Sequence, residues 1–262
     1  MSAILLNKRV VHYEVLGRGR PLIFLHGWLG TWRYWIPMMQ VASTNYRAYA
    51  IDLWGYGDTA KDAQSYSVDE QAALLKGFLD EMGIGQVALV GHGLGAIVGL
   101  RFAQQSPGLV NRIMSISFPS HAGMVNARLA AETPENLLDW VLEKSPLANS
   151  IRGDASKNDA KVIPDFLKSI QLINLESLWK QTEVMNLLVH GQDDPVVALP
   201  DAADWKDMSY NTHAIVFEQS GHFPMIDEAN KFTRLLVEFL ALESGETPRN
   251  LQLKEEWKRR VR

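Results

Sequence analysis

The sequence predicts an α/β protein with a doubly wound, mostly parallel sheet. Three features support this prediction: short continuous apolar runs, helical segments that alternate with them, and turn residues that separate the two. Apolar runs without alternation are typical of strands that are buried on both faces, as in a parallel sheet. Strands that alternate with helices indicate βαβ units.

The predicted elements follow one another in a regular order. A two-residue alternation over Val10–Val15 ends at Gly17 and Gly19, which indicates an antiparallel hairpin before the parallel part. The apolar runs then predict strands at Leu22–Leu25, Tyr46–Ile51, Gln86–Val90, Ile113–Ser117, Met185–Val189 and Ala214–Phe217. The helical segments are Trp32–Ala42, Ser67–Met82, Leu94–Gln105, Pro200–Met208 and Asn230–Leu242. Ser67 and Glu70 form a capping box for the second of these helices.

Residues 120–181 interrupt this order because they contain no convincing strand pattern. Helical patterns at Pro134–Glu143 and Ile163–Leu172 flank a polar stretch, Arg152–Asp159. We interpret residues 120–181 as a small helical cap, inserted into a core that residues 1–119 and 182–262 form. Trp140 and Trp179 of this cap are expected at the entrance to a pocket.

Composition excludes several classes of protein. The chain of 262 residues carries 26 basic and 30 acidic side chains, a net charge of −4, so no nucleic-acid partner is expected. Without a cysteine it can form neither a disulfide nor a thiolate nucleophile or metal ligand. The histidines show no paired ligand spacing, so we predict no metal and no cofactor.

The longest apolar stretch does not have the character of a membrane span. It runs over Val87–Ala103, and His92 and four glycines interrupt it. A span needs about 20 largely apolar residues, so this stretch predicts a buried strand and helix. The first residues also lack the apolar region of a secretory signal. We therefore expect no membrane span and a cytoplasmic location, while the oligomeric state stays undetermined.

Chemistry-bearing motifs lie where predicted strands end. His26–Gly30 follows the first buried run, Gly91–Gly95 joins a strand to a helix, and His190–Pro195 and Ser220–Pro224 follow two late strands. Ligands in open α/β sheets bind beyond the carboxyl ends of the strands. Taken in this order, the motifs resemble the alpha/beta-hydrolase superfamily over nearly the whole chain. The resemblance implies the alpha/beta-hydrolase fold, a hydrolase activity and a small-molecule substrate.

One residue departs from the family's pattern. The strand-to-helix turn of the family, called the nucleophile elbow, reads G-x-S-x-G. Here the same turn reads Gly-His-Gly-Leu-Gly, with Gly93 at the nucleophile position. A covalent serine mechanism cannot run through Gly93, and the aspartate nucleophile of some family members is equally absent. We expect the space over Gly93 to hold a water, an anion or a ligand oxygen, and Gly93→Ser to gain ester hydrolysis.

The resemblance assigns roles to other residues. His222 would be the general base, and Asp194, with Asp193 as its rival, would orient it. The backbone amides of Trp28 and Leu94 would form the oxyanion hole. The substrate-binding candidates are Gly27, Trp28, His92 and Trp140. Alternatively, Gly27 only shapes its loop and His92 only packs beside the turn. We also expect the pocket mouth to gather Trp28, Trp32, Trp35 and Trp54.

Three interpretations of Gly93 stay open at this stage. The serine could have been replaced to give an inactive enzyme of the esterase or lactonase type. Alternatively, the glycine is native and His222 with Asp194 performs general-base chemistry on a small, mostly apolar carbonyl or ester-type substrate. In the third interpretation, the protein is a pseudo-hydrolase that binds a ligand without catalysis.

Overall fold

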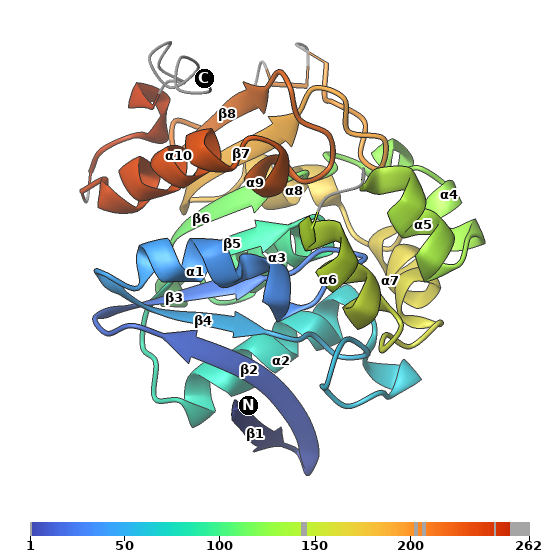
Figure 1. Ribbon diagram of the computed structural model, residues 1–262. Coiled ribbons are helices and arrows are strands. Elements are labelled where there is room, and N and C mark those ends of the chain that lie inside the picture. The colour runs from blue at the N-terminus through green and yellow to red at the C-terminus, as the bar shows by residue number, and fades with distance from the viewer. Residues whose placement is uncertain (1, 143–145, 202–203, 206–207, 244, 252–262) are drawn as a thin grey trace.

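A single eight-stranded sheet organises the molecule (Figure 1). The computed structural model describes residues 2–142, 146–201, 204–205, 208–243 and 245–251. Within this part of the chain, the strand order is β1-β2-β4-β3-β5-β6-β7-β8. The strands are β1 (Ser2–Leu6), β2 (Arg9–Leu16), β3 (Arg20–Leu25), β4 (Tyr46–Ile51), β5 (Val87–His92), β6 (Val110–Ile116), β7 (Met185–Gly191) and β8 (Thr212–Phe217).

The sheet is parallel from β4 to β8, and only β1 and β2 run antiparallel to their neighbours. The predicted hairpin is confirmed, although it pairs β1 with β2 and begins earlier than the alternation suggests. Asn7 and Lys8 connect the two strands, with φ values of 51° and 66°. Two successive left-handed residues are typical of a tight hairpin turn that matches the twist of the strands. All six predicted buried strands are present.

Helices cover both faces of the sheet, as a doubly wound fold requires. Figure 1 shows α1 and α10 on one face, with α2, α3 and α8 on the other. Their bounds are α1 (Ile36–Ala42), α2 (Val68–Glu81), α3 (Leu94–Gln105), α8 (Leu175–Lys180), α9 (Pro224–Asp227) and α10 (Ala229–Ala241). Ser67 caps α2, because its side chain accepts a hydrogen bond from the Glu70 amide. No helix in the described ranges is both long and apolar enough to cross a membrane.

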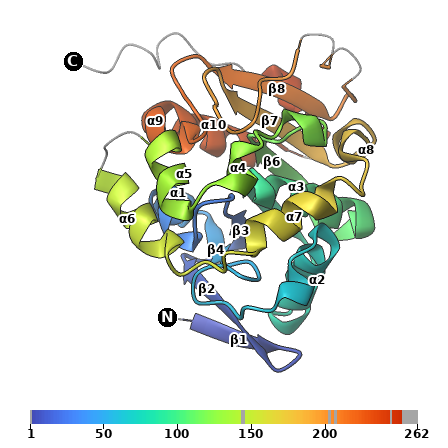
Figure 2. The ribbon, with the colours of Figure 1, turned by 90° about the vertical axis from the view of Figure 1, so that its right-hand side faces the viewer.

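A group of helices lies beyond the carboxyl ends of the strands, between β6 and β7 in the sequence (Figure 2). This group contains α4 (Arg128–Ala131), α5 (Pro134–Val141), α6 (Pro146–Ala155) and α7 (Val162–Ile170). In the described residues of this interval, β structure is restricted to a single bridge between Val125 and Val197. The helical cap is therefore present, while its treatment as a domain with bounds at 120 and 181 stays a prediction.

One helix was not predicted, and one predicted helix is wrong. Part of the polar stretch Arg152–Asp159 belongs to α6, where Asp154 accepts hydrogen bonds from Thr31 and Arg33 of the core. The described residues of Pro200–Met208 form a loop with a turn at 204–205. There the Asp204 carboxylate accepts a hydrogen bond from the Asp201 amide at 2.9 Å, and such local bonding competes with a helix.

The ends of β7 and β8 approach each other closely at one glycine. A Cβ atom on Gly191 would lie 1.9 Å from the carbonyl oxygen of Gly221 and 2.5 Å from that of Ser220. Only a residue without a side chain allows the backbone after β8 to pass this near. The contact brings the loop that carries Asp194 beside the loop that carries His222.

We predict that Gly191→Ala lowers the free energy of unfolding by about 1–3 kcal/mol, because the methyl group displaces backbone that cannot relax freely. Gly85→Ala is the matched control, since a Cβ on Gly85 would meet nothing within 4 Å. Urea unfolding midpoints of the two variants measure the difference. Equal midpoints would contradict the close approach.

Candidate functional site

The turn between β5 and α3 has the backbone conformation of a sharp elbow. β5 ends at His92, α3 begins at Leu94, and Gly93 between them has φ 49° and ψ −108°. The Gly93 amide donates a hydrogen bond to the Ile116 carbonyl at 2.8 Å, which fixes the turn against β6. A left-handed φ is costly for a residue with a side chain, so glycine relaxes this turn.

The indole of Trp28 lies against Gly93. A Cβ atom on Gly93 would lie 2.6 Å from Nε1 of Trp28 and 3.0 Å from its Cδ1. Trp28 is fully buried and packs edge-on against Phe166 of α7, with ring centroids 5.4 Å apart. The indole therefore lies where the side chain of a serine would begin. The water, anion or ligand oxygen expected over Gly93 stays a prediction.

His222 and Asp194 form a buried hydrogen-bonded pair. Nδ1 of His222 lies 2.9 Å from Oδ2 and 3.1 Å from Oδ1 of Asp194. Because an ionised carboxylate can only accept, Nδ1 carries the proton and Nε2 is left as an acceptor. Within the described part of the chain, Nε2 is buried and has no hydrogen-bond partner. This is the geometry of an oriented general base.

Asp194, not Asp193, makes this contact. The amides of Val196 and Val197 also donate to Oδ1 of Asp194, at 2.8 and 3.0 Å. Burial tends to raise the pKa of Asp194, but the His222 ring and these donors outweigh it and lower the pKa to about 2. The carboxylate is thus ionised at neutral pH and stabilises a positive charge on His222.

The two predicted oxyanion donors flank the elbow. The Leu94 amide is the first of α3, where the helix dipole adds positive potential. The Trp28 amide lies in the loop after β3. Among the hydrogen bonds of the described residues, neither amide donates to a protein acceptor. Unpaired amides at such positions can stabilise a developing oxyanion.

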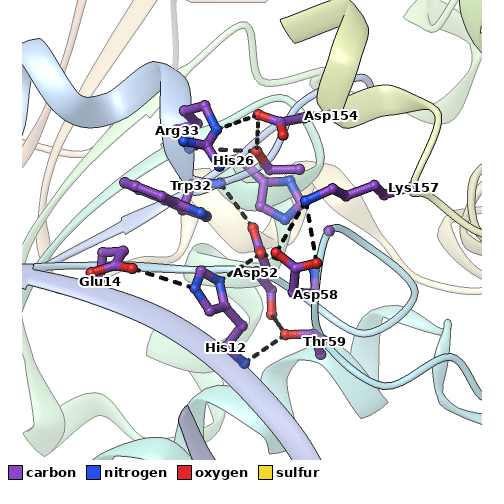
Figure 3. Close-up of polar contacts among 12 residues, drawn as sticks. His12, Glu14, His26, Trp32, Arg33, Asp52, Asp58, Thr59, Asp154 and Lys157 are labelled. Carbon is purple, nitrogen blue, oxygen red and sulfur yellow. Dashed lines mark hydrogen bonds and ion pairs between the residues drawn. The ribbon is translucent and has the colours of Figure 1, made fainter. Parts of the chain in front are cut away.

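The loop after β3 is held by two buried side chains. His26 contacts the Gly27 carbonyl through Nδ1 at 2.9 Å and accepts from the Leu53 amide through Nε2 at 3.0 Å. Asp52 accepts from the Trp32 amide at 2.9 Å and from Nδ1 of His12 at 2.9 Å, as Figure 3 shows. The position of the Trp28 amide therefore depends on bonds from this loop to Asp52 and Leu53, directly after β4, and on the bond that holds Asp52 to His12 of β2.

One cluster in the described ranges has the composition of a metal site. His12, Asp52 and Asp58 place ligand atoms within 4.8 Å of one another. However, Asp52 already accepts hydrogen bonds from three N–H groups, and the Lys157 ammonium lies 3.2 Å from Asp58. Although burial lowers the pKa of His12, Asp52 raises it on balance. His12 and Lys157 supply positive charge to the two carboxylates, as a metal ion would. The cluster therefore has the character of a structural ion-pair network.

The substrate-binding candidates Gly27, Trp28, His92 and Trp140 lie in different surroundings. Trp28 lines a cavity of about 260 Å³, together with apolar cap residues that include Leu129, Leu137 and Ile163. Gly27 donates its amide to the Tyr34 hydroxyl at 2.6 Å. His92 is fully buried, and both of its ring nitrogens are hydrogen-bonded.

The other tryptophans do not gather at one mouth. Trp140 lies under the guanidinium of Arg128, and Trp179 is buried in α8. Trp32, Trp35 and Trp54 contact His12, Phe24 and Arg9 respectively, and Trp32 is only partly buried whereas Trp35 and Trp54 are core residues. Aromatic residues that are near in the sequence are thus distributed over different layers.

The sequence pattern of the alpha/beta hydrolase family matches residues 22–235. The chain belongs to the alpha/beta hydrolase family. The match includes the elbow at Gly93 and both members of the His222–Asp194 pair.

Relatives of this alpha/beta hydrolase act on different substrates. The 2-hydroxy-6-oxo-6-(2'-aminophenyl)hexa-2,4-dienoic acid hydrolase of Metapseudomonas resinovorans is 26% identical over 262 aligned positions, covering 87% of each chain. The pimeloyl-[acyl-carrier protein] methyl ester esterase of Vibrio cholerae is also 26% identical, over 87% of this chain and 97% of its own. The solved structure of the enol-lactonase from Burkholderia xenovorans superposes with a TM-score of 0.81 at 17% identity, covering 92% of this chain and all of the lactonase.

Sequence reasoning missed His190 as part of this region. It lies at the end of β7, is almost fully buried, and packs near Trp205 with ring centroids 6.0 Å apart. Burial lowers its pKa to about 4, against a smaller opposing effect of Asp194. The only local signal was its place in the His-Gly-x-x-Asp motif.

We predict that His190 makes this hydrolase acid-labile. Between pH 6.5 and about 4 the ring is protonated in the unfolded chain but neutral in the folded one. The unfolded state then binds more protons, so stability falls as the pH is lowered through this window, by on the order of 3 kcal/mol. His190→Leu should reduce this fall in urea titrations, and buried His26 and His92, whose pKa values burial also lowers, should account for the remainder. His121→Leu at the surface should leave the fall unchanged. An unchanged pH dependence in His190→Leu would contradict the assignment.

Proposed function

We propose that this alpha/beta hydrolase performs general-base chemistry without a covalent intermediate on a small, mostly apolar carbonyl or ester-type substrate. The observation that carries the proposal is the intact His222–Asp194 pair beside an elbow that has no nucleophile. The family membership and the esterase, lactonase and oxo-acid hydrolase names among its relatives support a carbonyl substrate. The cavity beside Trp28 would hold the apolar part of that substrate.

In the proposed hydrolysis, water replaces the missing serine. His222 takes a proton from a water molecule through Nε2 while the water oxygen attacks the carbonyl carbon. The carbonyl oxygen becomes an oxyanion, which the amides of Trp28 and Leu94 stabilise. Asp194 stabilises the charged His222 ring. When the intermediate collapses, the carbon–oxygen bond to the leaving group breaks and His222 returns the proton to the departing oxygen.

The fit between Gly93 and Trp28 favours a native glycine over an inactivated serine. A serine Cβ at this turn would lie within 3.0 Å of two indole atoms, in a fully buried region. Both residues are therefore matched to each other, as neighbours in a well-packed core are. The indole N–H, which has no partner among the described residues, would be a further donor to an oxygen near the turn.

The second candidate is a ligand-binding pseudo-hydrolase. The burial of Trp28 and His222 favours it, since substrate can reach Nε2 of His222 only if neighbouring side chains move. A protein that only binds would have no use for an ionised acid that orients a base. Replacement of the base separates the two candidates.

The direct test is the hydrolysis of nitrophenyl esters and small lactones by the native chain, His222→Ala and Asp194→Asn. We expect hydrolysis that falls by about 100-fold or more in His222→Ala, since general-base catalysis contributes 10²–10⁴-fold. The rate of Asp194→Asn should fall by a similar factor, because a neutral amide no longer stabilises the positively charged His222 ring. Glu218→Gln, on the surface of the same region of the chain, is the control. Rates that do not respond to either site substitution would exclude the mechanism.

Contrary to the sequence-based prediction, we expect Gly93→Ser alone to remain without acyl-enzyme chemistry. The serine meets the Trp28 indole and a left-handed φ, which together should lower stability by about 1–3 kcal/mol. Gly93→Ser combined with Trp28→Leu removes the clash and should show a burst of nitrophenol. Trp28→Leu alone should show no burst, because Gly93 in that variant still supplies no hydroxyl. A burst from the single serine variant at unchanged melting temperature would contradict the packing argument.

A further inference from the structure

A chain of buried hydrogen bonds connects the oxyanion loop to the general base. The Gly27 amide donates to the Tyr34 hydroxyl at 2.6 Å. That hydroxyl lies 3.0 Å from Nδ1 of His92, and Nε2 of His92 lies 2.8 Å from the backbone carbonyl of His222. Tyr34 and His92 come from different elements, and each has at most 2% of its surface exposed.

The chemistry of the groups fixes the direction of this chain. A carbonyl oxygen can only accept, so Nε2 of His92 must carry the proton that reaches His222. Nδ1 is then an acceptor, and the Tyr34 hydroxyl donates to it while accepting from Gly27. The Tyr34 hydroxyl and the His92 ring thus each donate one hydrogen bond and accept one, and both ring nitrogens of His92 have a partner.

We propose that Tyr34 and His92 are positioning residues that set the oxyanion amide of Trp28 and the base His222 relative to each other. The inference rests on the proposed function, because it assigns roles to the amide and the ring. Gly27 immediately precedes Trp28, so the bond from Tyr34 fixes the peptide next to the donor. His92 fixes the peptide of the base itself, and its ring packs against the His222 ring at a tilt of 45°, with centroids 4.4 Å apart.

The burial of Tyr34 and His92 keeps both groups of this hydrogen-bond chain in one protonation state. Burial lowers the pKa of His92 well below its ordinary value, and repulsion from His222 adds to this. Burial also raises the pKa of Tyr34 well above its ordinary value. Both groups are therefore neutral around pH 7. The Ser117 hydroxyl adds a longer contact of 3.4 Å to the same His222 carbonyl.

The packing explains why no larger residue replaces Gly27. A Cβ on Gly27 would lie 2.7 Å from Nδ1 of His92, at the position where the ring accepts its bond from Tyr34. The elbow histidine, the tyrosine and this glycine are therefore matched to one another. His92 packs beside the turn, as one of its two interpretations predicts, and its hydrogen bonds add the positioning role proposed here.

The first experiment tests the direction of the hydrogen-bond chain and needs no enzymatic activity. Nitrogen NMR of ¹⁵N-histidine in the native protein should show His92 as the Nε2–H tautomer throughout the range in which the fold is stable. Finding the Nδ1–H tautomer would overturn the proposal, because the His222 carbonyl would then face a nitrogen without a proton. This arm is decisive even if the protein hydrolyses no ester, so failure of the proposed function is distinguishable from failure of the chain.

The second arm compares Tyr34→Phe with Tyr56→Phe. Both remove a buried hydroxyl, but that of Tyr56 has no partner in the described part of the chain. Since misplacement by about 1 Å can cost 100-fold in rate, Tyr34→Phe should lower kcat by about 10- to 100-fold with little change in KM. Tyr56→Phe should retain the native kcat. His92→Gln, which can donate and accept, should recover part of the kcat that His92→Leu loses. Equal kcat values for Tyr34→Phe and Tyr56→Phe would overturn the proposal.

Discussion

The contact between Trp28 and Gly93 constrains the rest of the site. An indole ring and a turn without a side chain occupy the volume in which an alpha/beta hydrolase with a serine elbow would hold its nucleophile. With that volume filled, covalent chemistry has no place at the turn, and the polar groups that remain are His222, Asp194, the Trp28 indole N–H and two backbone amides. The chemistry of the site therefore depends on a base and on hydrogen-bond donors.

These groups are held by bonds from several layers of the fold. The close approach at Gly191 joins the loops of Asp194 and His222, while Asp52 and His26 hold the loop that carries Trp28. The cap adds a further tie, since Asp154 of α6 binds Thr31 and Arg33 at 3.1 and 2.9 Å. Side chains that are fixed in this way lose little freedom when a substrate binds, which is the basis of preorganised catalysis.

Most of the sheet could be predicted from the sequence, because strands buried on both faces need continuous apolar runs and parallel connections need helices between them. The His222–Asp194 contact was predicted from the resemblance to the alpha/beta hydrolases, together with the places of both residues after late strands, and Asp193 was its rival. The direction of the Trp28 side chain could not be predicted, since no local pattern records which layer an aromatic ring enters. Helix α6 was missed because Gly153 and Asp154 have a low preference for helices, and the tertiary bonds of Asp154 help to offset this preference.

Tyr34 illustrates the same limit of sequence patterns at the candidate site. In the sequence it is one aromatic residue in a run of apolar and aromatic side chains. Its hydroxyl gains a role only because β3, β5 and the loop after β8 converge, so that Gly27 and His92 lie on either side of it. Long-range convergence of this kind is set by topology, and the residues concerned carry no spacing signature.

The central claim is that the native chain hydrolyses its substrate without an acyl-enzyme. Rapid-quench intact-mass spectrometry during turnover of a nitrophenyl ester tests it most directly, with the rate of His222→Ala measured alongside. The account predicts steady turnover that depends on His222, linear release of nitrophenol from the first turnover, and a protein mass that never changes. A protein species heavier by the acyl group, formed and consumed at the rate of turnover, would contradict it.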